Sequence, residues 1–411
     1  MRSLLALAGL GILLGAGPAH AFRLYEDPAA HRWFDFTGYA QPYWRMVDDP
    51  CVYGRPSGGV APACAVSTTP DGFGLTRARP IFRGQLNART SFHLELRTVP
   101  NVELLDLRLH FELVEGLRLT VGRFRVPFSR QEMTSESRLQ LPDRASFIAN
   151  TPGRQLGTKL RYETGFGALP ERFLTVEAGI YNGESAKERA PINNIDEDYL
   201  YAARVQVAPF GAPAVLFEGD ARPLEDRAQP LVVVGASWTF DTRGPQNGNY
   251  DQRRLGADLL ALWHGVSLYG ELYRYDRDYK NDGTTFDPDR HGVGWNVQAG
   301  AFVPAPYVRE HLELAGRVEA WDPEIAREAR FAPQLLSQSS GSGPGRPSTS
   351  TQAHRNYVAG VNWYFEGHDL KLQAAYTHRV ETEAWQLSQE FAGIPQDVDD
   401  DSFRLQLTYR F

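Results

Sequence analysis

Three arginines at two- and four-residue steps, Arg77, Arg79 and Arg83, are the residues whose type and spacing most clearly suggest chemistry. In an extended strand, which advances about 3.3 Å per residue, their side chains would share one face. A guanidinium stays charged at any physiological pH and offers a planar fork of donors to phosphate or carboxylate oxygens. The surrounding stretch 72–94 holds four arginines and no acidic residue. The spacing therefore predicts a strand that presents a row of anion-binding groups.

The elements that would hold such a row are strands in which apolar and polar residues alternate. Leu105, Leu107, Leu109, Phe111 and Leu113 are apolar with polar residues between them, and 402–411 repeats this period of two. The pattern predicts about sixteen strands of roughly ten residues, the length that a tilted strand needs to cross the hydrocarbon layer of a membrane. They are predicted at 33–43, 76–86, 89–98, 102–113, 117–126, 155–163, 172–182, 199–208, 231–241, 253–264, 266–277, 292–303, 311–321, 355–366, 369–380 and 402–411.

The lengths of the connections predict how these strands are joined. If the first strand runs outward from the periplasm, every odd-numbered connection is external. Except for 99–101 these are long: 44–75, 127–154, 183–198, 242–252, 278–291, 322–354 and 381–401. The even-numbered connections are tight, except for the Pro-rich 209–230. The sequence thus predicts an all-β fold, a transmembrane antiparallel up-and-down β-barrel with long external loops and short periplasmic turns. A soluble sandwich or propeller would require repeated units, and the sequence shows none.

The first 21 residues resemble a signal peptide. Arg2 precedes an apolar run from Leu4 to Gly17, and Ala19-His20-Ala21 has the small-residue pattern of a cleavage site. An N-terminal membrane anchor is the alternative, but the run is shorter than the about 20 residues of a spanning helix. We therefore expect residues 22–411 to form a single barrel domain. At the other end, Tyr409 and Phe411 resemble the signature by which the barrel assembly machinery recognises its substrates.

The chain has two cysteines, Cys51 and Cys64, both in the first predicted external loop. An exported protein meets an oxidising periplasm, so this pair predicts one local disulfide. A metal pair or a redox motif would need a different spacing. The net charge of −7 argues against a nucleic-acid surface.

No enzyme or cofactor motif is present in the sequence: neither a phosphate-binding loop, nor metal-ligand histidine spacing, nor a nucleophile elbow. We therefore expect no enzyme activity, no cofactor and no metal. The rival from another class is a barrel hydrolase with a serine and a histidine on its lipid face. No motif supports its candidates, Ser237 and His378.

The order of motifs in 72–210 resembles the phosphate-selective porin O and P family. The motifs are Leu75–Arg79, Val121–Ser129, Glu132–Glu136, Pro152–Gly157 and Ala178–Gly183, within about a third of the chain. The resemblance implies a sixteen-stranded barrel, usually a homotrimer, whose third external loop, here 127–154, folds into the lumen and constricts it. The family's strongly anion-selective members carry a lysine cluster. This chain departs from them, since it has four lysines in all, Lys159, Lys187, Lys280 and Lys371.

The face opposite the apolar residues should line the lumen, and it carries mixed charge. The predicted anion track consists of Arg77, Arg79, Arg83, Arg97, Arg108, Arg118, Lys159 and Arg161. Acids on the same face are Asp35, Glu95, Asp106, Glu112, Glu163 and Glu177. The predicted constriction loop adds Arg130, Arg138, Arg144 and Arg154. Either the basic residues bias the pore towards anions, as rings of Arg or Lys do in anion pores, or these charges pair across strands and only solvate the wall.

Several features outside the lumen complete the prediction. Counting residues by twos along the predicted strand 117–126 places the Arg123 and Arg125 side chains on its lipid-facing side. A bulge, or a position at the rim of the strand, could turn them inward. Tryptophans near strand ends are typical of interfacial girdles: Trp33, Trp44, Trp238, Trp263, Trp321 and Trp363. The acidic loop 381–401 suits a solvated surface or a divalent-cation bridge to lipopolysaccharide, and the low-complexity stretch within 322–354 suits a flexible external loop.

Together these patterns predict a porin of the bacterial outer membrane that passes small hydrophilic solutes through a water-filled channel, with mild anion preference. The expected partners are outer-membrane lipid and lipopolysaccharide, the barrel assembly machinery and small anionic solutes such as phosphate. A non-selective diffusion porin and a purely structural barrel are the alternatives.

Overall fold

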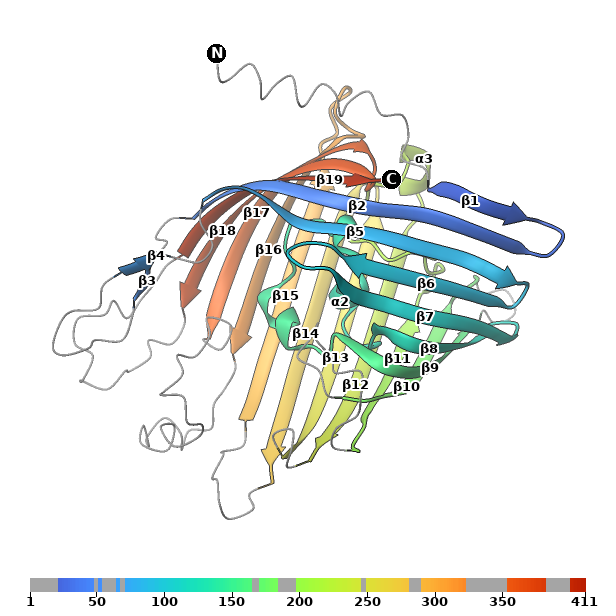
Figure 1. Cartoon of the computed structure of the whole chain (residues 1–411). Helices are drawn as coiled ribbons and strands as arrows, with labels where there is room; N and C mark the ends of the chain where they lie inside the picture. The colour runs from blue at the N-terminus through green and yellow to red at the C-terminus, as the bar shows by residue number, and fades with distance from the viewer. Residues whose placement is uncertain are drawn as a thin grey trace.

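The computed structural model describes residues 21–47, 51–53, 64–66, 71–164, 170–183, 197–244, 249–280, 290–322, 353–381 and 400–411. Within these residues, sixteen antiparallel strands pair in sequence order and close into a barrel between β19 and β2 (Figure 1). The predicted barrel is confirmed, and each predicted strand overlaps an observed one. The strands are β2 (Arg32–Val47), β5 (Gly72–Asn87), β6 (Thr90–Arg97), β7 (Glu103–Val114), β8 (Leu117–Arg125), β9 (Arg154–Thr164), β10 (Leu174–Tyr181), β11 (Leu200–Val207), β12 (Leu231–Arg243), β13 (Tyr250–Trp263), β14 (Val266–Tyr279), β15 (Arg290–Phe302), β16 (Leu312–Asp322), β17 (His354–Glu366), β18 (Leu370–Glu381) and β19 (Asp400–Arg410).

Three further strands were not predicted. β1 (Phe22–Asp27) pairs with β2 in line with β19, where it extends the sheet at the end that carries the short turns. β3 (Cys51–Tyr53) and β4 (Cys64–Val66) form a separate two-stranded sheet. The cysteine side chains, and with them the predicted disulfide, lie outside the described residues. So do the predicted signal peptide up to residue 20 and most of the loops 322–354 and 381–401.

Alternation along the strands separates an apolar outer face from a polar inner face. In β15, Val293, Trp295 and Val297 are exposed, whereas Asn296 and Gln298, at the alternate positions, are buried. An apolar outer face is what the hydrocarbon layer requires, because lipid cannot hydrogen-bond a polar side chain. None of the helices in the described residues is long and apolar enough to cross a membrane.

Two side chains lie on the opposite face from the one that the sequence predicted. Trp321 is 2% exposed and packs inside the barrel, so its assignment to the interfacial girdle was wrong. It shares the inner phase of β16 with Glu313 and Glu319, and counting by twos along that strand could have shown this. Leu105 is fully buried because a bulge shifts the β6–β7 register beside it, between Asp106 and Leu104.

Candidate functional site

The segment 126–153 enters the barrel and lies against its inner wall, where Figure 1 shows α2 (Arg130–Met133) enclosed by the strands. Its two ends meet where the Val126 amide donates to the Gly153 carbonyl at 2.8 Å. Ser129 caps α2 by accepting a hydrogen bond from the Glu132 amide at 3.0 Å. Two short 3₁₀ turns follow, Glu136–Arg138 and Ser146–Asn150. We call this segment the inner loop.

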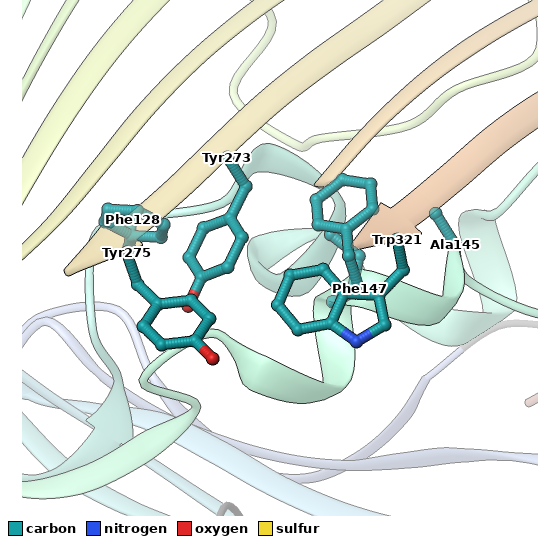
Figure 2. Packing of buried hydrophobic residues seen from close by; sticks show 7 residues of the cluster. Phe128, Ala145, Phe147, Tyr273, Tyr275 and Trp321 are labelled. Atoms are coloured by element: carbon teal, nitrogen blue, oxygen red, sulfur yellow. The ribbon is translucent and has the colours of Figure 1, made fainter. Parts of the chain in front are cut away.

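Aromatic packing attaches the inner loop to β14 and β16. Figure 2 shows Phe128 and Phe147 of the loop against Tyr273, Tyr275 and Trp321 of the wall. Phe147 stacks on Tyr273 with ring centroids 6.0 Å apart, and Tyr273 donates its hydroxyl to the Asn150 carbonyl at 2.9 Å. Such aromatic contacts stabilise the docked loop by apolar burial and by ring geometry.

Buried ion pairs hold the loop at a second place. Arg130 is 1% exposed, and its Nε donates to the Asp258 carboxylate of β13 at 2.7 Å. The same carboxylate pairs with Arg204 of β11 at 2.6 Å, and Arg204 also donates to the Phe128 carbonyl. One buried acid therefore joins two strands to the loop.

Glu136 is the centre of a cluster of four groups near β5. Its carboxylate accepts hydrogen bonds from Arg79 at 2.8 Å, Arg144 at 2.8 Å, Arg125 at 3.2 Å and the Tyr39 hydroxyl at 2.9 Å. Burial alone would raise the pKa of Glu136, but Arg144, Arg79 and Arg125 outweigh burial and hold this pKa well below its usual value. The carboxylate thus stays ionised and ties wall to loop.

The sequence left open whether the Arg123 and Arg125 side chains face the lumen, and the structure shows that the two differ. Arg125, the last residue of β8, turns inward from the rim and also donates to the Met133 and Thr134 carbonyls at 3.1 and 3.2 Å. Arg123 instead bonds the Leu104 carbonyl of the neighbouring strand. The position of Arg125 at the end of the strand, two residues before Pro127, was the one available signal for its inward turn.

The inner loop is attached at a third place, where uncharged donors surround the Glu313 carboxylate of the wall. Glu313 of β16 accepts hydrogen bonds from Gln140 of the loop at 2.6 Å, from Asn362 at 2.9 Å and from the Tyr364 hydroxyl at 2.6 Å. Gln373 of β18 donates to the Gln140 carbonyl at 2.8 Å. The wall from β13 to β19 is therefore covered by the loop.

The wall from β5 to β10 is covered less completely, and most of the predicted basic residues line it. Their nearest acids are Asp35 for Arg83, Glu103 for Arg97, Asp106 for Arg108, Glu112 for Arg118, Glu177 for Lys159 and Glu163 for Arg161. Arg83, His93 and Arg108 occupy one row across β5, β6 and β7. Arg77 donates to Gln41 at 3.1 Å.

Arg154 and Arg138, the two remaining arginines of the predicted constriction loop, differ in how they are paired. Arg154 is buried and donates to Asp106 at 2.7 Å. Among the described residues, no carboxylate lies within 4.0 Å of Arg138. Burial, and then the nearby Arg410, lowers the pKa of Arg138 to about 10, so it remains charged at neutral pH.

One cluster offers ligand atoms for a metal ion but is a poor cation site. His93, Glu95 and Asp106 place their ligand atoms within 4.8 Å of one another. However, Glu95 accepts a hydrogen bond from Arg79 at 2.9 Å, and Asp106 accepts one from Arg154 at 2.7 Å. These guanidinium groups already neutralise the carboxylates and would repel a metal ion.

Comparison with known proteins agrees with this geometry. The family model described as phosphate-selective porin O and P matches residues 64–273. Among curated protein sequences, none matches this chain.

Solved structures share the fold at low sequence identity. The anion-selective porin from Comamonas acidovorans is 12% identical, covers 92% of this chain and 100% of its own, and has a TM-score of 0.55. The outer membrane channel DcaP of Acinetobacter baumannii is 12% identical over 94% of this chain and 99% of its own, with a TM-score of 0.53. OmpT of Vibrio cholerae is 11% identical over 95% and 100%, also at 0.53.

Proposed function

This chain belongs to the phosphate-selective porin O and P family of outer-membrane channels, and we propose that it passes small hydrophilic solutes by diffusion with a mild preference for anions. The observation that carries the preference is an asymmetry of exposure on the wall from β5 to β10. We call this partly open surface the basic wall. Its basic groups reach the lumen, and three of the six acids paired with them, Asp35, Asp106 and Glu177, lie beneath.

Three pairs on the basic wall show the asymmetry. The Arg83 side chain is 46% exposed and that of Asp35 is 7%; for Arg108 and Asp106 the values are 29% and 5%. Arg161 is 32% exposed against 6% for Glu177. In each pair the nitrogen and oxygen are 3.8 Å apart, beyond hydrogen-bond distance. A solute in the lumen therefore meets guanidinium groups more closely than carboxylates.

Two effects keep the expected preference for anions weak. Arg118 and Glu112 are similarly exposed, at 40% and 37%, and Arg161 also bonds Glu163 at 2.5 Å, so part of the positive charge is neutralised. Salt at physiological strength screens charges beyond about 8 Å. Weak attraction also suits conduction, because a solute has to leave each site as readily as it enters. Phosphate or another small oxyanion fits such a wall.

The test is the reversal potential of the channel in a salt gradient. We expect the wild type to favour the anion, and the triple variant Arg83→Gln/Arg108→Gln/Arg161→Gln to lose that preference. Arg274→Gln is the matched control, because Arg274 is 59% exposed on the outer phase of β14. A wild-type channel without anion preference, or a triple variant indistinguishable from it, would leave the general diffusion porin as the better description.

The finer partner assignments belong to the same proposal. A homotrimer rests on the family membership, and contacts with lipopolysaccharide rest on the outer-membrane location and on the apolar outer face. Recognition of Tyr409 and Phe411 by the barrel assembly machinery rests on the sequence pattern. We propose no catalytic step. Ser237 is buried on the inner face of β12, and His378 of β18 pairs with Asp401 of β19 at 2.7 Å.

A further inference from the structure

The connection between β11 and β12, residues 208–230, is the one long exception among the connections at the periplasmic end. The structure shows that its middle part runs into the barrel instead of crossing the end as a tight turn. Glu218 and Asp220 are 1% and 0% exposed. Phe217 packs on an apolar cluster of the inner wall that includes Leu260 and Tyr269. We call residues 208–230 the periplasmic segment.

Hydrogen bonds fix the periplasmic segment to three neighbouring turns. Asp220 accepts from the Gly265 amide at 3.2 Å, and the His264 amide donates to the Arg227 carbonyl at 2.7 Å. Arg227 donates to the Arg309 carbonyl at 2.9 Å, and His368 contacts the Gly219 carbonyl at 3.3 Å. The segment is thus attached along β13 to β18, the same side of the barrel that the inner loop covers.

Glu218 joins the periplasmic segment to the inner loop. Its carboxylate accepts hydrogen bonds from the Gln131 side chain at 2.9 Å and from the Gln140 amide at 3.1 Å. The Gln298 side chain of β15 donates to the same carboxylate at 3.2 Å, and the Glu218 amide donates to the Arg138 carbonyl at 3.3 Å. One residue of the segment therefore contacts the loop at three positions and the wall at a fourth.

These contacts differ in kind from the arginine pairs of the loop. The three donors to the Glu218 carboxylate are uncharged amides, so the bonds depend on an acceptor with two oxygens at one place. Alanine at this position would remove the acceptor of all three bonds. The Gln298 side chain would keep its bond to the Gln140 side chain, but the Gln131 side chain and the Gln140 backbone amide would lose their acceptor, and a buried donor without a partner is costly. Glutamine would keep the volume but turn an NH₂ group towards one of the donors.

We propose that the periplasmic segment is the second half of the pore constriction, and that Glu218 is its positioning residue. The segment enters from the periplasmic end, meets the inner loop at Glu218, and holds it against β13 to β18. The open path is thereby confined to the basic wall. This inference rests on the proposed channel function, but it does not depend on the sign of the ion selectivity.

The experiment compares the full-length wild type with Glu218→Ala, Glu218→Gln and the control Glu225→Ala. Glu225 belongs to the same segment but is exposed. The first measurement is hydrogen exchange of the peptide that contains the Gln140 amide. We expect about tenfold faster exchange in Glu218→Ala, a smaller increase in Glu218→Gln, and no change in the control, because exchange reports the local opening of that bond.

The second measurement is the single-channel current. A released inner loop should give higher conductance and more open-channel noise in Glu218→Ala, with the wild-type heat-modifiable shift on gels as evidence of an intact barrel. If Glu218→Ala does not fold, Glu218→Gln is measured in its place. Wild-type exchange and current in a folded Glu218 variant would overturn the proposal. Failure of the wild type to conduct would instead count against the channel function, since the exchange result stands without any current.

Discussion

Arg79 of β5 makes a two-pronged contact with Glu136 of the inner loop, with Nη1 2.8 Å from Oε2 and Nη2 3.2 Å from Oε1. Both side chains are 3% exposed, and Arg79 also bonds Glu95 at 2.9 Å. Such a geometry suits a guanidinium and no other cation. It assigns Arg79 to holding the loop, whereas Arg83, on the same strand, faces the lumen.

Replacement of Arg79 should therefore act on loop docking more than on ion selectivity. We expect Arg79→Ala to weaken docking by about 3–5 kcal/mol, because it leaves two buried carboxylates with one cation fewer. Arg79→Lys should restore only part of this, because an ammonium cannot bridge both oxygens. The readout is open-channel noise together with the reversal potential. Arg83→Ala is the control, for which a selectivity change with quiet current is expected. The reverse outcome would contradict the division of roles between the two arginines.

The strands were predictable from the sequence because alternation, strand length and turn position all agree, and each depends on local chemistry. The inner loop's contacts were not predictable in the same way. Glu136 is one of several acids in its stretch, and only the folded chain brings Arg79, Arg125 and Arg144 around it. Glu218 lies in a connection that was noted for its length and proline content, but its length alone does not show whether it turns inward.

Errors in the predicted faces have local physical causes. A bulge beside Leu105 shifts the phase of β7 and turns an apolar residue inward. Trp321 was assigned by residue type, although its phase on β16 matches that of Glu319. The sequence also could not separate exposed from buried members of the arginine set, since that depends on which part of the wall the loop covers.

The aromatic attachment of the inner loop should be measurable on its own. Phe147 is fully buried, so Phe147→Ala should cost about 3–5 kcal/mol of docking free energy by loss of apolar burial and cavity formation. Phe73→Ala, at a side chain that is 92% exposed, should cost far less. Hydrogen exchange across 145–151 provides the measurement. Equal protection of this peptide in both variants would show that the aromatic cluster does not hold the loop.

The low pKa of Glu136 predicts how docking responds to acid. Because this pKa is depressed in the folded protein, its contribution is fully present above the ordinary value near 4.5 and is lost as the pH falls through the depressed value. We therefore expect noise and conductance to stay constant from neutral pH to about pH 5 and to change only in stronger acid. In Glu136→Gln the acid-dependent change should disappear. A transition of the wild type between about pH 5 and 7 that persists in Glu136→Gln would point to another titrating group.

The most direct measurement is modification of engineered cysteines on opposite walls during current recording, in a background where Cys51 and Cys64 are replaced by serine. Arg108→Cys lies on the basic wall, and Asn296→Cys lies on the inner face of β15, where the side chain is 1% exposed. A bulky water-soluble thiol reagent should reduce the current through Arg108→Cys and leave Asn296→Cys unchanged, because solutes pass along the basic wall. Block at Asn296→Cys with no effect at Arg108→Cys would place the path on the opposite side and contradict the proposed pore.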